Sequence, residues 1–236
     1  MRTVIIIQAR MGSTRLPGKV MEDIAGKPVL AHVIERCKAA KNANDVVVAV
    51  PKELASLPLT EVARKSKVNF FLGDERNVLD RYYGAAVSFS AHVIVRVTAD
   101  CPLLDPQVVD NVIQLLNHRK ADYASNVHPR SFPKGLDVEA FTMEALIAAR
   151  LGAREGDDTE HVTPWIIRHK RRACVASGNA QLAEYRWTLD YPEDLEFLRA
   201  VAERAGHLPM SMGAVVALLN RCPELTDINK KWRKAA

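Results

Sequence analysis

Short runs of β-branched residues alternate with segments of helical periodicity through the first half of the 236-residue chain. Strands are predicted at 4–8, 45–50, 69–72 and 92–97, and helices at 27–40, 75–88 and 106–118. In the first helix, apolar residues recur at helical spacing, namely Val29, Leu30, Val33, Ile34 and Cys37. This alternation is typical of a doubly wound, mainly parallel sheet with helices on both faces. The predicted fold class is α/β.

The second half of the chain has a more mixed pattern. Strands are predicted at 122–127, 136–141 and around 172–176, with another ending at residue 189. Helices are predicted at 142–151 and 165–169, and two more close the chain. We therefore expect a small β-rich subregion here. No repeat, low-complexity stretch or linker interrupts the sequence, so a single domain over 1–236 is predicted.

Composition and charge fit an ordinary globular protein, with 48% hydrophobic and 26% charged residues and a formal charge of +5. A polyanionic substrate such as a nucleoside triphosphate explains this mild charge as well as nucleic acid would. Four dispersed cysteines without a C-x-x-C pair suggest neither a zinc site nor a disulfide framework. A basic cluster at 230–234 is interpreted as a solvated tail, with an RNA contact as the minor alternative. Without a secretory signal or a membrane-length apolar run, the sequence predicts a cytoplasmic protein.

The most informative segment is the loop that follows the first predicted strand. It carries Arg10, Arg15 and Lys19 around Gly12-Ser13-Thr14. Backbone N–H groups and fixed cations at the carboxyl end of a strand can bind one anion, most often a nucleotide phosphate. An ordinary strand-to-helix turn with solvated basic residues is the alternative.

The spacing of this loop excludes the two commonest phosphate motifs. Five residues separate Gly12 from Gly18, and Val20 follows Lys19, so a Walker A loop does not fit. No G-x-G-x-x-G follows the strand either, which argues against a Rossmann dinucleotide site.

Two aspartates follow predicted strands and are candidates for holding a cation. Asp100 comes just after the strand at 92–97, where it could hold a divalent cation bound to a triphosphate, or merely form a turn before Pro102. Asp190 precedes a helix that begins with an early proline. It could belong to the same site, or it could only cap that helix in a capping box with Glu193.

Residues 8–19, Gln-Ala-Arg-Met-Gly-Ser-Thr-Arg-Leu-Pro-Gly-Lys, closely resemble the opening motif of the cytidylyltransferase family that includes CMP-KDO synthetases. They are more similar still to its spore-coat polysaccharide biosynthesis branch, although the opening Gln-Ala-Arg replaces the more usual Pro-Ala-Arg. Further blocks that resemble the family lie at 71–82, 96–105, 134–139, 158–164 and 187–194. The resemblance runs from about residue 3 to 195.

The resemblance implies a Rossmann-like domain of the nucleotide-diphospho-sugar transferase type. Its nucleotide half would span about 1–120, and its acceptor and metal-completing half, with a β-rich acceptor or dimerisation subregion, about 121–236. It implies Mg²⁺ held by Asp100 and Asp190, and catalytic roles for Arg15, Lys19 and Asp100. The implied nucleotide-binding residues are Ala9, Arg10, Met11, Gly12, Ser13, Thr14, Arg15, Lys19, Asp74 and Arg81. For Asp74 and Arg81, a helix N-cap and a surface ion pair are the alternatives. The implied acceptor-binding residues are Gly135, Asp137, Glu139, Glu160 and His161.

The reaction implied by the resemblance is transfer of CMP from CTP to the hydroxyl of an acidic sugar, with release of pyrophosphate, for surface polysaccharide or glycoconjugate synthesis. Implied partners are CTP and the sugar, without nucleic acid or membrane, and relatives are commonly homodimers. A sugar-1-phosphate nucleotidyltransferase and a non-catalytic nucleotide- or RNA-binding protein remain alternatives. A related glycosyltransferase is a third, but its usual D-x-D motif is missing.

Overall fold

The computed structural model describes residues 1–208 and 210–233. Its main sheet has seven strands in the order β5-β4-β1-β6-β8-β7-β9 among these residues. The strands are β1 (Thr3–Gln8), β4 (Asp45–Pro51), β5 (Asn69–Gly73), β6 (Val93–Thr98), β7 (Tyr123–Ser125), β8 (Glu139–Thr142) and β9 (Arg172–Cys174). The strands β5, β4, β1 and β6 are mutually parallel, whereas β8 is antiparallel to β6 and β7. The α/β prediction is confirmed, and the later strands extend the same sheet.

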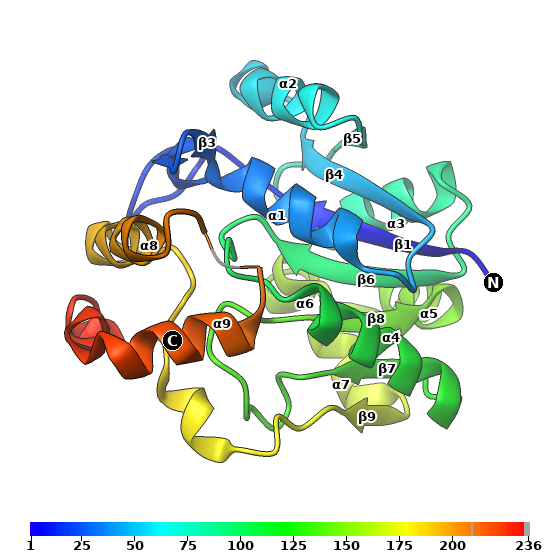
Figure 1. Ribbon diagram of the computed structural model, residues 1–236. Coiled ribbons are helices and arrows are strands. Elements are labelled where there is room, and N and C mark those ends of the chain that lie inside the picture. The colour runs from blue at the N-terminus through cyan, green and yellow to red at the C-terminus, as the bar shows by residue number, and fades with distance from the viewer. Residues whose placement is uncertain (209, 234–236) are drawn as a thin grey trace.

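Helices cover both faces of the sheet (Figure 1). One face packs against α1 (Val29–Ala39), α2 (Leu57–Lys65), α4 (Pro106–Arg119), α8 (Pro192–Ala205) and α9 (Met212–Arg221). The other packs against α3 (Val78–Ser88), α5 (Met143–Gly152) and α7 (Pro164–His169), and the short α6 (Asp157–His161) contacts α3. No helix among the described residues is long and apolar enough to cross a membrane.

The apolar sequence of the inner strand β1 follows from its burial on both faces of the sheet. Val4 and Ile6 point into the core beneath α3 and α5, and Ile5 and Ile7 point into the opposite core. All four side chains are fully buried. A strand covered on both faces cannot alternate apolar with polar residues. Because β1 lies between β4 and β6, its carboxyl end is flanked by neighbouring strands at the carboxyl edge of the sheet.

Several boundaries differ from the predictions. The predicted helix at 27–40 begins only at Val29, because residues 27–28 form β3 (Lys27–Pro28), which pairs with β2 (Asp23–Ile24). The predicted helix at 75–88 begins at Val78, where the side chain of Asn77 accepts a hydrogen bond from the N–H of Asp80. The helices α2 and α6 were not predicted.

The predicted strand ending at Leu189 is wrong. Among the described residues this segment belongs to no strand of a sheet and forms one isolated parallel bridge, between Lys134 and Arg186. It instead crosses the carboxyl edge of the sheet, where the N–H of Leu189 donates 2.8 Å to the carbonyl of Asp100. Beyond α9 the chain continues as two 3₁₀ turns, Pro223–Asp227 and Lys230–Trp232, that return towards α8.

Candidate active site

The loop after β1 keeps its own shape through internal hydrogen bonds. The N–H of Gly18 donates 3.1 Å to the carbonyl of Met11, and Gly18 adopts the left-handed conformation with φ of 70°. The N–H of Leu16 donates to the hydroxyl of Ser13. By contrast, the backbone N–H groups of residues 11–14 donate to no other described residue. Successive free N–H groups in a turn form a binding place for an anion.

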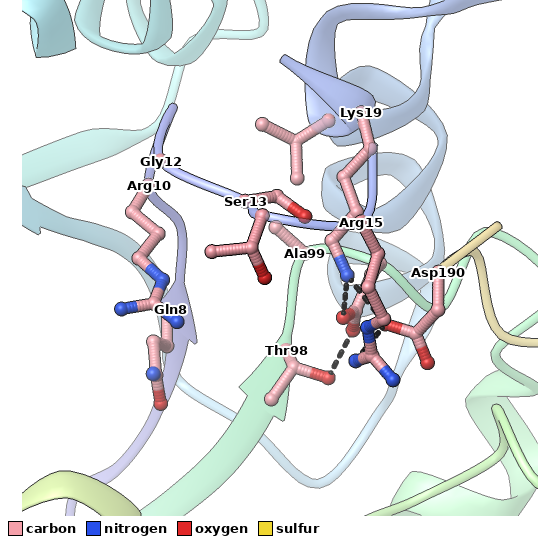
Figure 2. Close-up of a pocket in the computed structure, with 12 residues that line it drawn as sticks. Gln8, Arg10, Gly12, Ser13, Arg15, Lys19, Thr98, Ala99 and Asp190 are labelled. Atoms are coloured by element: carbon pink, nitrogen blue, oxygen red, sulfur yellow. Dashed lines mark hydrogen bonds and ion pairs between the residues drawn. The ribbon is translucent and has the colours of Figure 1, made fainter. Parts of the chain in front are cut away.

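This loop forms one wall of a cavity of about 530 Å³ (Figure 2). The cavity is lined by Gln8, Arg10, Gly12, Ser13, Thr14, Arg15, Lys19, Val20, Thr98, Ala99, Asp100 and Asp190. Figure 2 shows Gln8 and Arg10 on one side and Lys19, Arg15 and Asp190 on the other. Ala9 is buried and its N–H donates to Ala49 in β4, so it anchors the loop to the sheet.

Lys19 joins the two aspartates that the sequence singled out. Its ammonium donates 2.6 Å to Asp100 and 2.8 Å to Asp190, although residues 100 and 190 lie far apart in the sequence. Burial by itself disfavours the charged forms of Lys19 and Asp100. Their mutual attraction and hydrogen bonding outweigh this, so the pKa of Lys19 is raised and the pKa of Asp100 is lowered. The three side chains therefore form a charged cluster at the base of the cavity.

Arg15 completes this cluster from the other side of Asp190. Its guanidinium donates 2.9 Å to the carboxylate of Asp190 and 3.3 Å to the hydroxyl of Tyr191, and it lies 5.0 Å from the Tyr191 ring centre. The hydrogen bond to Tyr191 and the charge of Asp190 together raise the pKa of Arg15. Arg10, across the cavity, makes no hydrogen bond or ion pair with another described residue.

A buried ion pair holds Asp190 in place. Arg186, whose side chain is fully buried, donates 2.7 Å to Asp190 and forms two-pronged contacts with the buried carboxylate of Asp194. Asp194 also accepts from the N–H groups of Asp190 and Tyr191 at the start of α8. The capping alternative for Asp190 is therefore wrong. The carboxylate of Asp194 accepts from the backbone N–H groups at the start of α8, and the Asp190 carboxylate faces the cavity.

Asp100 is held by a tight turn after β6. Its carboxylate accepts 2.6 Å from the hydroxyl of Thr98, and its carbonyl accepts from the Thr188 hydroxyl as well as from Leu189. The two aspartate-bearing segments are thus fastened to each other. The carboxylate accepts hydrogen bonds from Thr98, Lys19 and the thiol of Cys101, so Asp100 does more than form a turn before Pro102.

The donor set at this point suits a hard divalent cation. The structure groups no three His, Cys, Asp or Glu side chains as a metal site within residues 1–208 and 210–233. Mg²⁺, however, is usually bound by one or two carboxylates with substrate phosphates and water completing its shell. Asp100 and Asp190 reach a single ammonium, so they lie close enough to share one cation.

Asp74 lines a second cavity of about 560 Å³ that shares Arg10 with the first, whereas Arg81 does not line either cavity. Asp74, Glu75, Glu155 and Glu160 give it an acidic lining. The carboxylate of Asp74 accepts from the N–H groups of residues 76 and 77, so it shapes the loop and does not cap α3. Arg81 lies buried beneath and donates 2.7 Å to the Asp74 carbonyl, so the surface ion pair considered for it is wrong.

The predicted acceptor residues are only partly brought together. Asp137, Glu139 and His161 line a third cavity of about 240 Å³, whereas Glu160 faces the second. The Glu139 carboxylate is buried; it pairs with Arg96 and accepts a 2.6 Å hydrogen bond from Tyr123. Asp137 forms a two-pronged ion pair with Arg130.

Gly135, also predicted on the acceptor side, lines none of the three cavities and packs against the backbone of residues 187–188.

The sequence analysis did not predict four residues that line the cavity, Gln8, Val20, Thr98 and Ala99, nor the two residues Arg186 and Tyr191 that contact Asp190 and Arg15. Thr98 and Tyr191 stand beside the selected aspartates, so proximity in sequence was an available signal. No signal in the sequence pointed to Arg186, because the residues next to it in the sequence do not distinguish a fully buried arginine from an exposed one.

The chain is similar to known proteins over most of its length. A family model described as cytidylyltransferase matches residues 4–205. The chain is 32% identical to the spore coat polysaccharide biosynthesis protein SpsF of Bacillus subtilis, covering 94% of this chain and 95% of that protein. It is 31% identical to the uncharacterised protein MJ1063 of Methanocaldococcus jannaschii, covering 99% and 97%.

A solved structure is also similar over nearly the whole chain. It is a cytidylyltransferase from Leptospira borgpetersenii, with a TM-score of 0.90, 30% sequence identity and coverage of 96% of this chain and 97% of that one. The family prediction made from residues 8–19 is confirmed. The chain belongs to the cytidylyltransferase family.

Proposed function

We propose that this protein transfers CMP from CTP to a sugar hydroxyl and releases pyrophosphate. The observation that carries the proposal is the meeting of Lys19 with Asp100 and Asp190 beside the free N–H groups of residues 11–14. A phosphate cradle, two fixed cations and a pair of carboxylates are the parts that phosphoryl-type transfer requires, because such chemistry depends on positioning and charge neutralisation.

In the proposed reaction the sugar oxygen attacks the α-phosphorus of CTP. A new P–O bond forms, the bond to the β-phosphate oxygen breaks, and pyrophosphate leaves with the electron pair while the hydroxyl proton passes to water. The N–H groups of residues 11–14 orient the triphosphate, and Arg15 and Lys19 neutralise the charge on the departing pyrophosphate. Asp100 and Asp190 would hold Mg²⁺, which when bound neutralises phosphate oxygens and lowers the pKa of the attacking hydroxyl.

The second cavity supports cytosine as the base. It adjoins the phosphate cavity at Arg10, so a nucleotide with its phosphates on the loop can direct its base there. Carboxylates accept hydrogen bonds from the exocyclic amine of cytosine, whereas uracil presents an oxygen at that position. Glu155 and Glu160 line this cavity, and we assign both to that amine, which moves Glu160 from the acceptor side, where the sequence predicted it, to the base.

For the acceptor we propose an acidic sugar of a polysaccharide precursor, bound in the third cavity. Basic side chains there are Arg96, His128 and His161, and Arg96 already pairs with Glu139. A sugar carboxylate would therefore contact the histidines, while Asp137 accepts from sugar hydroxyls. Comparing an acidic sugar with its neutral counterpart as acceptor tests this assignment separately from the choice of nucleotide.

Pyrophosphate release from CTP with a panel of sugars is the test of the reaction. Asp100→Asn and Asp190→Asn are expected to abolish release while CTP binding persists, because they remove metal ligands and leave the loop. Retained turnover in both variants would contradict the proposal. Higher turnover of the wild-type protein with a sugar 1-phosphate than with a free sugar would instead favour the related nucleotidyltransferase alternative.

A further inference from the structure

The chain beyond the family match packs behind the candidate site. The family model ends at residue 205, yet Trp232 stacks on Tyr191 with ring centres 3.6 Å apart and planes only 2° from parallel. Tyr191 in turn accepts the hydrogen bond from Arg15. A side chain near the end of the chain is therefore one contact removed from a proposed phosphate-binding arginine.

Several other contacts fasten the same C-terminal segment. The Trp232 indole N–H donates 2.9 Å to Glu193, and Lys231 forms a 2.5 Å ion pair with that carboxylate. Lys231 and Trp232 together lower the pKa of Glu193 to about 2. Further inward, the Asn229 amide donates to the carbonyl of Arg186 and to the carboxylate of Asp194.

These contacts contradict the interpretation of residues 230–233 as a freely solvated tail; Lys234, the last residue of that cluster, lies outside the described residues. Lys230 and Lys231 do expose their ammonium groups, which explains why charge alone suggested solvent. The segment nevertheless packs against the protein through the ring of Trp232, which follows the two lysines in the sequence.

We infer that Trp232 is a positioning residue that holds Tyr191, and through it Arg15, for the triphosphate. The inference rests on the proposed function, because Arg15 matters here as a phosphate ligand. A parallel stack fixes the plane of the Tyr191 ring. That plane sets the direction of its hydroxyl towards Arg15 and of its face beneath the guanidinium. A fixed cation neutralises developing charge without reorganising during the reaction.

The test is a double-mutant cycle of Trp232→Ala and Arg15→Ala, read as kcat and KM for CTP. Trp232→Ala is expected to lower kcat/KM for CTP about tenfold in the wild-type background and to have no further effect once Arg15 is alanine. Trp232→Phe, which retains a stacking ring, is expected to restore most of the loss. Lys230→Ala, on the same 3₁₀ turn but paired with Asp227 alone among the described residues, is the matched control and should behave as wild type.

Tyr191→Phe provides a second variant that keeps the stack and removes only the hydroxyl. It should lower kcat/KM for CTP in the wild-type background and not in Arg15→Ala. An equal loss from Trp232→Ala in both backgrounds, or no loss in either, would overturn the inference. Failure of the wild-type protein to bind CTP in calorimetry would instead overturn the proposed function, so the two failures are distinguishable.

Discussion

Lys19 donates a 2.6 Å hydrogen bond to Asp100 across the carboxyl edge of the sheet, and so places its ammonium between Asp100 and Asp190. Its side chain is 12% exposed, so solvent screens this pair only weakly. The lysine thus offsets the charge of the carboxylates that we propose as metal ligands. Binding of Mg²⁺ and triphosphate would transfer the ammonium from carboxylates to phosphate.

The Lys19–Asp100 pair makes stability depend on pH at both extremes. The folded-state pKa of Asp100 lies below its ordinary 3.8, so its stabilising contribution is complete above that pH and disappears as the pH falls through the lowered pKa. The pKa of Lys19 is raised above 10.5, so its contribution is complete below that pH and is lost as the pH rises through the raised pKa. Urea unfolding across pH should show the acid loss weakened in Asp100→Asn. An unchanged acid limb in that variant would contradict the pairing.

Replacing Arg15 with alanine should cut turnover about 100-fold or more, because removing one preorganised charge stabiliser typically has that cost. Pyrophosphate release at saturating CTP measures the change. Arg64→Ala on α2 removes an arginine that is 69% exposed and paired only with Glu61, and it should leave turnover unchanged. Near-normal turnover in Arg15→Ala would refute its assignment.

Asp194→Asn should lower the free energy of unfolding by about 3 kcal/mol or more, because it leaves the buried Arg186 without its main counter-charge. The carboxylate also accepts from two backbone N–H groups and from Asn229. Denaturant titration measures the loss. The exposed Asp227→Asn, whose partner is Lys230, should change stability by less than about 0.5 kcal/mol. Equal stability of the two variants would count against this buried network.

Gly135→Ala should be more harmful than an alanine at another glycine of similar conformation. Gly135 has φ of 109°, and a Cβ there would lie 2.5 Å from the backbone nitrogen of Thr188. Gly178 has φ of 79° but no atom within 4 Å of its hypothetical Cβ. Both variants carry the cost of a left-handed alanine, about 1 kcal/mol. Only Gly135→Ala should additionally displace the segment before Asp190 and impair CTP turnover; equal turnover in the two would show that the close approach is unimportant.

The sequence was sufficient for the parallel half of the sheet and for the first loop. The apolar runs of β1, β4 and β6 follow from strands buried on both faces, which leave a continuous signal. The predicted strands at 122–127 and 172–176 contain β7 and β9 but are too long, since each of these strands has only three residues. The chain before Asp190 is not a strand, and it is held by hydrogen bonds to Asp100. Such long-range pairing has no local pattern to reveal it.

Within the site, the basic loop and Asp100 were predictable because they follow strands that end at a common edge, whereas Asp190 was singled out by its resemblance to the family's second aspartate motif. Arg186 and Trp232 were not, since a buried ion pair and a stacked ring depend on partners elsewhere in the fold. The acceptor candidates Glu160 and His161 are adjacent in sequence but face different cavities. Their roles, Mg²⁺ binding, the homodimer and the cytoplasmic location stay predictions.

The central claim is that the loop and the acidic second cavity bind CTP in preference to other nucleotides. Its most direct test is a thermal-shift measurement with CTP, UTP, GTP, ATP and dTTP, each with and without magnesium. A ligand that binds only the folded state raises the midpoint of unfolding. We predict a magnesium-dependent rise that is largest with CTP. No rise with any of the five nucleotides, or an equal rise with all of them, would contradict the account.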